Sequence, residues 1–236
     1  MDRFRQFKRS AASKRKVMAW SYTALKKFET CPRQHNEVNI KKTIKEPETV
    51  HTIWGKRAHV SIDNNIKTGE PLIEGITKHT WIKNLCDEAI AKGATIASEQ
   101  KVAITAGFKQ TTWFAKDVWC RVIFDLTIVG EKNAYIWDWK TGRPRPDETQ
   151  LDIFAGVGFK IWPDITVIGA RFAWLQDGTQ TRKTYTRLRE FEIWEKILPR
   201  VVRLELAQES KDFPPTPGRQ CRYCPVRSCE FNESKT

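Results

Sequence analysis

The sequence predicts an α/β protein in which a mixed β-sheet is flanked by helices. Segments with alternating apolar residues occupy the middle of the chain, and segments with apolar residues at helical spacing lie before, between and after them. This order of patterns is typical of α/β folds. At 236 residues the chain is long enough for one substantial core. We therefore expect a basic flexible arm over residues 1–19 and a single domain over residues 20–236.

Three helical segments are expected before the sheet. Ser21 or Thr23 can cap the first, which ends near Cys31 because a proline follows. This segment has apolar residues on one side, as a helix packed on a core requires. The second begins at Trp54, and the third runs from Trp81 to Ile90.

The predicted strands begin at Ala97–Ile104, which alternates between polar and apolar residues. Trp113-Phe114 and Val118-Trp119 are expected to carry the sheet on from there. The remaining predicted elements are, in chain order, strand Val122–Val129, a turn over 130–133, a strand from Tyr135 that stops at Gly142, a helix after Asp147, strand Val167–Leu175, a hairpin at Asp177-Gly178, strand Thr181–Thr186 and an amphipathic helix through about residue 208.

Two aspartates are predicted to face each other on neighbouring strands. If Val129 pairs with Ala134 across the turn, antiparallel pairing places Asp125 opposite Asp138. Opposed residues have Cβ atoms roughly 4.5–5.5 Å apart, and like charges placed so are destabilising. Alternation also puts Lys140 on the face of Asp138. The pattern favours a bound cation, and the alternative is a chance pair with one exposed aspartate and one bound to Lys140.

The net charge of +13 favours a polyanionic partner, because neutralised phosphates release counterions. A basic protein without such a partner would have the same composition. The arm over residues 1–19 is expected either to touch DNA or to have no specific role. The chain lacks a long apolar run and the apolar stretch of a signal peptide, so we expect a cytosolic protein that does not enter a membrane.

The cysteines predict a metal site. Cys221, Cys224 and Cys229 lie in a segment broken by proline and glycine, and such spacing in a cytosolic protein indicates metal ligation more than disulfide bonding. Thiolate sites take four ligands, and Cys31 is the expected fourth. Spacing alone leaves zinc, an iron–sulfur cluster and unligated cysteines open. The other two cysteines, Cys86 and Cys120, are expected to be small buried hydrophobes.

Taken together, these residues resemble the RecB-like branch of the PD-(D/E)XK nuclease superfamily, in particular the CRISPR-associated exonucleases and their phage-encoded relatives. The resemblance covers roughly residues 20–230. It is carried by a fixed order of motifs: Cys31-Pro32, Gly55 with His59, Glu99, Asp125, Asp138-Trp139-Lys140-Thr141-Gly142, Gln150 and the three C-terminal cysteines.

The resemblance implies a restriction-endonuclease-like core and a divalent-metal site. His59, Asp125, Asp138 and the main-chain carbonyl of Trp139 would hold Mg²⁺ or Mn²⁺. Lys140 and Gln150 would complete the catalytic set together with the two aspartates, with Glu99 on a nearby strand in a more distant role or simply on the surface. Gln150 has a competing structural explanation, because Asp147 and Gln150 have the spacing of a capping box.

At the cysteines, the resemblance implies a [4Fe-4S] cluster on Cys31, Cys221, Cys224 and Cys229, with zinc as the alternative. The tail carrying the last three would close onto the N-terminal helix. The chain departs from the family pattern at a few positions: Val122 replaces a common glycine, Phe154 a tyrosine and His35 an aromatic residue, and the gap between the last two cysteines is one residue shorter.

The implied activity is metal-dependent exonucleolytic hydrolysis of DNA, single-stranded or with free ends. It would serve recombination, replication or CRISPR-related processing in the cytoplasm of a bacterium or a phage-infected cell, together with recombination or CRISPR-adaptation proteins. The alternative is a DNA-binding or adaptor module that keeps the fold without cutting. A zinc-ribbon nucleic-acid binder would explain the cysteines but not the paired carboxylates.

Overall fold

The computed structural model describes residues 19–145 and 147–233, which form two compact units. The first contains residues 19–48 and 196–233, and the second contains residues 49–195. The arm predicted over residues 1–19 lies, except for its last residue, outside the described residues. The single domain predicted over residues 20–236 stays a prediction. In the part of the chain that the structure describes, no helix is both long and apolar enough to cross a membrane.

The second unit is built around a six-stranded sheet. Its elements are, in chain order, α4 (Val50–Thr68), the 3₁₀ turn η2 (Thr77–His79), α5 (Trp81–Ala91), β1 (Thr95–Thr105), β2 (Gln110–Thr111), β3 (Val118–Val129), β4 (Asn133–Lys140), α6 (Thr149–Ile161), β5 (Val167–Trp174), β6 (Gln180–Thr186), the 3₁₀ turn η3 (Arg187–Arg189) and the start of α7 (Glu190–Ser210).

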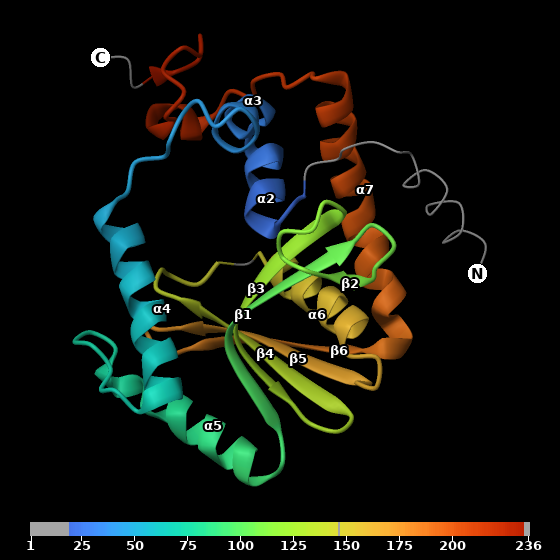
Figure 1. Cartoon of the computed structure of the whole chain (residues 1–236). Helices are drawn as coiled ribbons and strands as arrows, with labels where there is room; N and C mark the ends of the chain where they lie inside the picture. The colour runs from blue at the N-terminus through green and yellow to red at the C-terminus, as the bar shows by residue number, and fades with distance from the viewer. Residues whose placement is uncertain (1–18, 146, 234–236) are drawn as a thin grey trace. The chain divides into compact units, whose positions relative to one another are not determined.

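The strand order of the sheet is β2-β1-β3-β4-β5-β6. All neighbouring strands are antiparallel except β4 and β5, which are parallel and joined through α6. The predicted mixed sheet flanked by helices is therefore confirmed (Figure 1). The predicted register of the β3–β4 hairpin is also confirmed, because Val129 pairs with Ala134 and Leu126 with Trp137.

Helices cover both faces of this sheet. On one face, Trp137 and Trp139 of β4 pack with Ile62 of α4 and Cys86 of α5 in a single apolar cluster. On the other face α6 lies very close to the strands. A Cβ added at Gly158 would lie 2.9 Å from the Cδ1 atom of Ile168, so a larger residue there would require neighbouring side chains to move. The strand β4, which lies between these two layers of helices, is consequently buried on both faces.

Three details differ from the expectation. The helix α4 begins at Val50 rather than Trp54, because Thr49 and Thr52 cap it reciprocally. The segment Trp113-Phe114 lies in a turn between β2 and β3 and not in a strand, and the Arg121 side chain donates to the Trp113 carbonyl there. The capping box predicted for Gln150 is absent, as described below.

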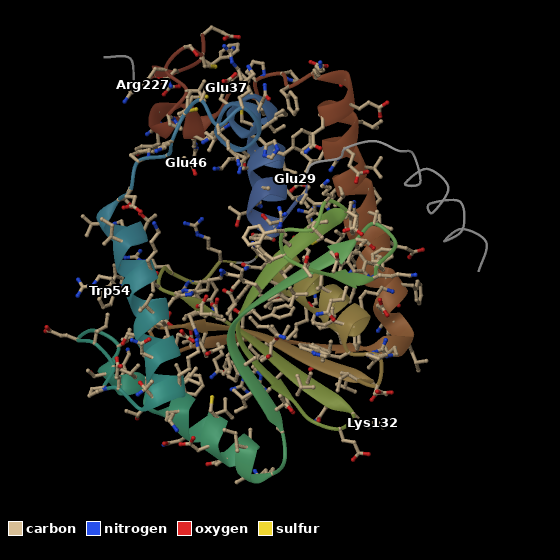
Figure 2. The ribbon with its side chains drawn as sticks, in the orientation of Figure 1. Glu29, Glu37, Glu46, Trp54, Lys132 and Arg227 are labelled. Carbon is tan, nitrogen blue, oxygen red and sulfur yellow. The ribbon has the colours of Figure 1, made fainter. Side chains whose placement is uncertain are left out.

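The first unit joins the two ends of the chain. Its elements are α2 (Tyr22–Thr30), α3 (Pro32–His35), the π turn η1 (Asn36–Ile40), the remainder of α7 and the 3₁₀ turn η4 (Arg219–Tyr223). Ser21 caps α2 as predicted, accepting from the Ala24 N–H. Glu29 of α2, labelled in Figure 2, accepts two hydrogen bonds from Arg200 of α7 at 2.6 and 2.7 Å. Such a bidentate pair fixes the relative orientation of the two helices.

His35 makes the stability of this unit sensitive to acid. Its ring is 1% exposed and packs edge-on against Phe28. Burial, and then the charge of Lys27, lower the pKa of His35 from 6.5 to about 4, although the Ala24 backbone opposes the shift. The folded protein therefore holds a neutral ring, and below pH 6.5 the unfolded chain takes up the proton first. The resulting stability is present above pH 6.5 and is lost as the pH falls towards 4.

We expect His35→Phe to remove this acid sensitivity. Between pH 7 and pH 4.5 the unfolding free energy of the wild type should fall by about 2 kcal/mol more than that of the variant. Urea unfolding at both pH values measures the difference. His51→Phe, at an exposed histidine, is the control. Equal losses in the wild type and His35→Phe would contradict the prediction.

Candidate active site

The hairpin of β3 and β4 brings two aspartates together, Asp125 within β3 and Asp138 near the end of β4. Asp125 is 6% exposed and Asp138 is 5% exposed. Beyond the pair Leu126–Trp137 the two strands separate, and the Asp125 carboxylate accepts from the Trp139 N–H at 2.6 Å. The side chain of Asp125 thus takes the place of a backbone acceptor. The charge of Asp125 acts on Asp138, so the two carboxylates lie near each other, but the two residues do not form the predicted cross-strand pair.

Lys140 and Gln150 form a closed ring of contacts with Asp138. The Lys140 ammonium lies 2.6 Å from Asp138 Oδ2 and donates to Gln150 Oε1 at 2.7 Å. The Gln150 amide donates to Asp138 Oδ1 at 2.8 Å. Gln150 therefore faces the carboxylate rather than the end of its own helix, and it is Asp147 that accepts from the Thr149 N–H. The expected capping box is wrong because these charged partners outcompete a backbone N–H.

His59 of α4 lies on the other side of Asp125. Its Nε2 is 3.1 Å from the Trp139 carbonyl oxygen, and its Nδ1 is 3.5 Å from Asp125 and 3.6 Å from Glu99. One ligand atom from each of His59, Glu99 and Asp125 lies within 4.8 Å of the others. The structure thus brings the predicted residues of the metal site together. It also places the Glu99 carboxylate beside His59, within the same cluster.

Glu99 is the residue whose role the sequence did not reveal. It lies inside β1 between the paired residues Ser98 and Gln100, but has a φ of +50°. A non-glycine residue in this region is strained by about 1–3 kcal/mol and persists only where its surroundings hold it. Here the local irregularity coincides with the approach of the Glu99 carboxylate to His59. Alternation along the strand cannot show such a local change of backbone conformation.

The electrostatics of the cluster favour an added cation. Burial, and then the charge of Asp125, raise the pKa of Asp138 to about 6, against the opposing effects of Lys140 and His59. For His59, burial lowers the pKa, but hydrogen bonding to Asp125 and Glu99 outweighs it and raises the pKa to about 10. Three carboxylates therefore surround a single imidazole and a single ammonium. The proton on His59 supplies the positive charge beside Asp125 and Glu99 that a bound metal ion would supply instead.

One buried oxygen of the cluster supports a metal site independently. Glu99 Oε1 has no hydrogen-bond partner among the described residues, whereas Asp138 Oδ2 is 2.6 Å from the Lys140 ammonium. A buried oxygen without a hydrogen bond is costly unless another group satisfies it. Carboxylate-rich donor sets suit Mg²⁺ and Mn²⁺. The residues present fit a hard divalent cation.

A second candidate centre lies in the first unit. Four cysteines line one small pocket there: Cys31, Cys221, Cys224 and Cys229. The Gly218 N–H approaches the sulfur of Cys221 at 3.4 Å, and Arg33 of α3 pairs with Glu230 beside Cys229. The predicted closure of the tail onto the N-terminal helices is therefore compatible with these contacts, which all lie within the unit.

The other three cysteines act on the Cys224 thiol. Burial is the largest cause that raises the pKa of the Cys224 thiol, and the charges of the other three cysteines raise it further. All six cysteines are free of disulfides. Four thiols without disulfides around one pocket fit a thiolate-bound metal centre. Cys86 and Cys120 are buried elsewhere, each 1% exposed, as predicted.

Comparison with known proteins places the chain in a family. The model of the PD-(D/E)XK nuclease superfamily matches residues 19–229. No curated protein matches the chain in sequence. Among solved structures, SSO0001 is 15% identical with a TM-score of 0.39, over 97% of this chain and 94% of that one. A candidate exonuclease from Eubacterium rectale is 9% identical with a TM-score of 0.47, over 92% and 88%. Because the family model matches most of its length, this chain belongs to the PD-(D/E)XK nuclease superfamily.

Proposed function

We propose that this protein is a Mg²⁺- or Mn²⁺-dependent exonuclease that hydrolyses phosphodiester bonds of DNA. The observation that carries the proposal is the convergence of Asp125, Asp138 and Lys140 in a chain of this superfamily. Two buried carboxylates with an ammonium beside them suit a metal ion and a phosphodiester. A DNA-binding module without activity would have no need to retain all three groups.

His59, Asp125, Asp138 and the Trp139 carbonyl would hold the ion, and the contacts of Glu99 add it to this set. When bound, a divalent ion polarises the scissile phosphate and lowers the pKa of water. The protein contributes a rigid frame for this chemistry. Asp125 is held by the Trp139 N–H, so its remaining oxygen stays directed towards His59.

Lys140 would act on the phosphate. Its ammonium is held by Asp138 and Gln150 at hydrogen-bond distances, so it cannot rotate freely. A fixed cation stabilises negative charge that develops in the transition state without reorganising at that moment. Gln150 is then a positioning residue, because it bridges Asp138 and Lys140 and holds both in one geometry.

For the cysteine centre we propose a [4Fe-4S] cluster with a structural role, and zinc as the alternative. The support is the common pocket of Cys31 and the three C-terminal cysteines. Such a centre would hold residues 19–48 and 196–233 together without redox chemistry of its own. Iron and sulfide analysis of anaerobically purified protein distinguishes the two metals.

The substrate would be DNA that is single-stranded or has free ends. The net charge of +13 supports a polyanion. Further parts of the proposal are a role in recombination, replication or CRISPR-related processing, partners from those systems and a cytoplasmic location in a bacterium or a phage-infected cell. A role confined to DNA binding is the competing outcome of the experiment that follows.

Digestion of labelled oligonucleotides tests the proposal. Single- and double-stranded DNA, labelled at the 5′ or the 3′ end, is incubated with the full chain and Mg²⁺, Mn²⁺ or EDTA. Progressive shortening from one end, present only with a divalent ion, is the expected result. Internal cuts in circular DNA would show that the protein is an endonuclease rather than an exonuclease. Binding without any cleavage would leave only the adaptor function.

A further inference from the structure

A basic and aromatic surface lies along β1 and β3, beyond the carboxylate cluster of Glu99, Asp125 and Asp138. Residues Arg121 and Ile123 are exposed or half-buried, whereas Val122 and Phe124 are buried, so alternation over 121–125 puts Arg121 and Ile123 on the same side of β3 as Asp125. On β1, Lys101 pairs with Ile123 and lies two residues from Glu99. At about 3.3 Å per residue, Arg121 is about 13 Å along the strand from Asp125.

Both cations of this surface gather over one ring. The Arg121 guanidinium lies 5.6 Å and the Lys101 ammonium 6.0 Å from the centroid of the Trp113 ring. The Arg121 Nε also donates to the Trp113 carbonyl at 3.0 Å. Among the described residues neither cation forms an ion pair with an acid. Two positive side chains held together without an acid make a site for anions.

The neighbouring ring points to the kind of anion. Phe114, in the turn between β2 and β3, is 89% exposed, whereas Phe108, in the turn between β1 and β2, packs on Trp119 and Trp194. The exposed Lys116 follows Phe114 two residues later. A bare aromatic ring next to unpaired cations suits a ligand with alternating phosphates and flat bases. Only an unpaired strand offers a base face for such a ring, since duplex bases stack on one another.

We propose that Lys101, Trp113, Phe114 and Arg121 form a docking surface for single-stranded nucleic acid, with phosphates on the two cations and a base on Phe114. Trp113 would position the cations. This proposal rests on the proposed nuclease function in one respect: the bound nucleic acid would run from this surface towards the carboxylate cluster. It names the unpaired strand, and not the duplex, as the preferred ligand of the site.

Binding of fluorescent 12-nucleotide strands to the full chain in EDTA tests the proposal without cleavage. The wild type is expected to bind oligothymidine more tightly than an abasic strand of equal length. Phe114→Ala should weaken oligothymidine binding about tenfold and leave the abasic strand unchanged, because stacking contributes about 1–3 kcal/mol per base. Lys101→Ala and Arg121→Ala should weaken both strands and each lower the salt slope by about 0.7.

Arg182→Ala is the matched control, because Arg182 is an exposed arginine on β6. This variant should still bind oligothymidine more tightly than the abasic strand, as the wild type does. Thermal melting shows whether each variant is folded, and the exposed Phe114 can be truncated without opening the core. Equal binding of both strands by the wild type, or an unchanged preference in Phe114→Ala, would overturn the proposal. So would equal affinity for a blunt duplex.

Cleavage with Mn²⁺ separates this proposal from the proposed function. If no variant cuts DNA while the effect of Phe114→Ala on binding persists, the nuclease assignment fails and the docking surface stands. If the wild type cuts and Phe114→Ala cuts single strands with unchanged KM, the docking surface fails and the nuclease stands.

Discussion

Asp138→Asn is expected to reduce DNA cleavage by about 10²–10³-fold or more. The substitution keeps the shape of the side chain but removes the charge that pairs with Lys140 at 2.6 Å and one oxygen of the candidate metal site. Because burial and the charge of Asp125 raise the pKa of Asp138, ionising it in the folded protein is costly. The variant should therefore remain folded. Single-turnover cleavage and calorimetric Mn²⁺ titration measure the two effects separately.

The control for this variant is Asp177→Asn. Asp177 lies in the turn between β5 and β6, where its carboxylate accepts from the N–H and the hydroxyl of Thr179. We expect its cleavage rate and Mn²⁺ affinity to match those of the wild type. Retention of a tenth or more of the wild-type rate by Asp138→Asn would show that the carboxylate is not essential and would remove the basis of the proposed chemistry.

Cys224→Ala is expected to release the metal of the cysteine centre and to unfold the first unit. Structural metal centres in small domains contribute on the order of 10 kcal/mol to folding. Loss of one thiolate of four leaves a centre that cannot close. Iron and zinc content should fall towards zero, and amide hydrogen exchange should accelerate over residues 19–48 and 196–233 while residues 49–195 stay protected.

Cys86→Ala tests whether the effect belongs to the centre. Cys86 is more deeply buried than Cys224, and it packs in the apolar cluster of α4, α5 and β4. Its loss should cost only the packing of one small side chain and leave the metal content unchanged. A fully metallated Cys224→Ala, or one with unaltered exchange in the first unit, would contradict the assignment of the four cysteines.

The approach of Asp125 to Asp138 was predictable because short turns and alternation together fix a register. Once Val129 pairs with Ala134, the pairs as far as Leu126–Trp137 follow, and a shift by one residue would have moved the buried side chains to the wrong face. The cap at Ser21 was predictable for a related reason, since its interaction is local in sequence.

The positions that escaped prediction depend on contacts distant in sequence. Gln150 has the correct spacing for a cap, but Asp138 and Lys140 from β4 attract its amide more strongly. Glu99 takes a strained conformation opposite β3, which no propensity of glutamate favours. Trp113-Phe114 has the composition of a strand, yet the chain reverses there and leaves Phe114 exposed.

The construction of the first unit from both ends of the chain has a consequence for synthesis. Residues 19–48 leave the ribosome long before residues 196–233, which supply Arg200 and three of the four cysteines. The N-terminal helices must therefore wait for the Arg200 partner of Glu29 until translation is nearly finished. Binding of the proposed metal would be confined to the same late stage, so a chain truncated before Cys221 would remain open to proteases and aggregation.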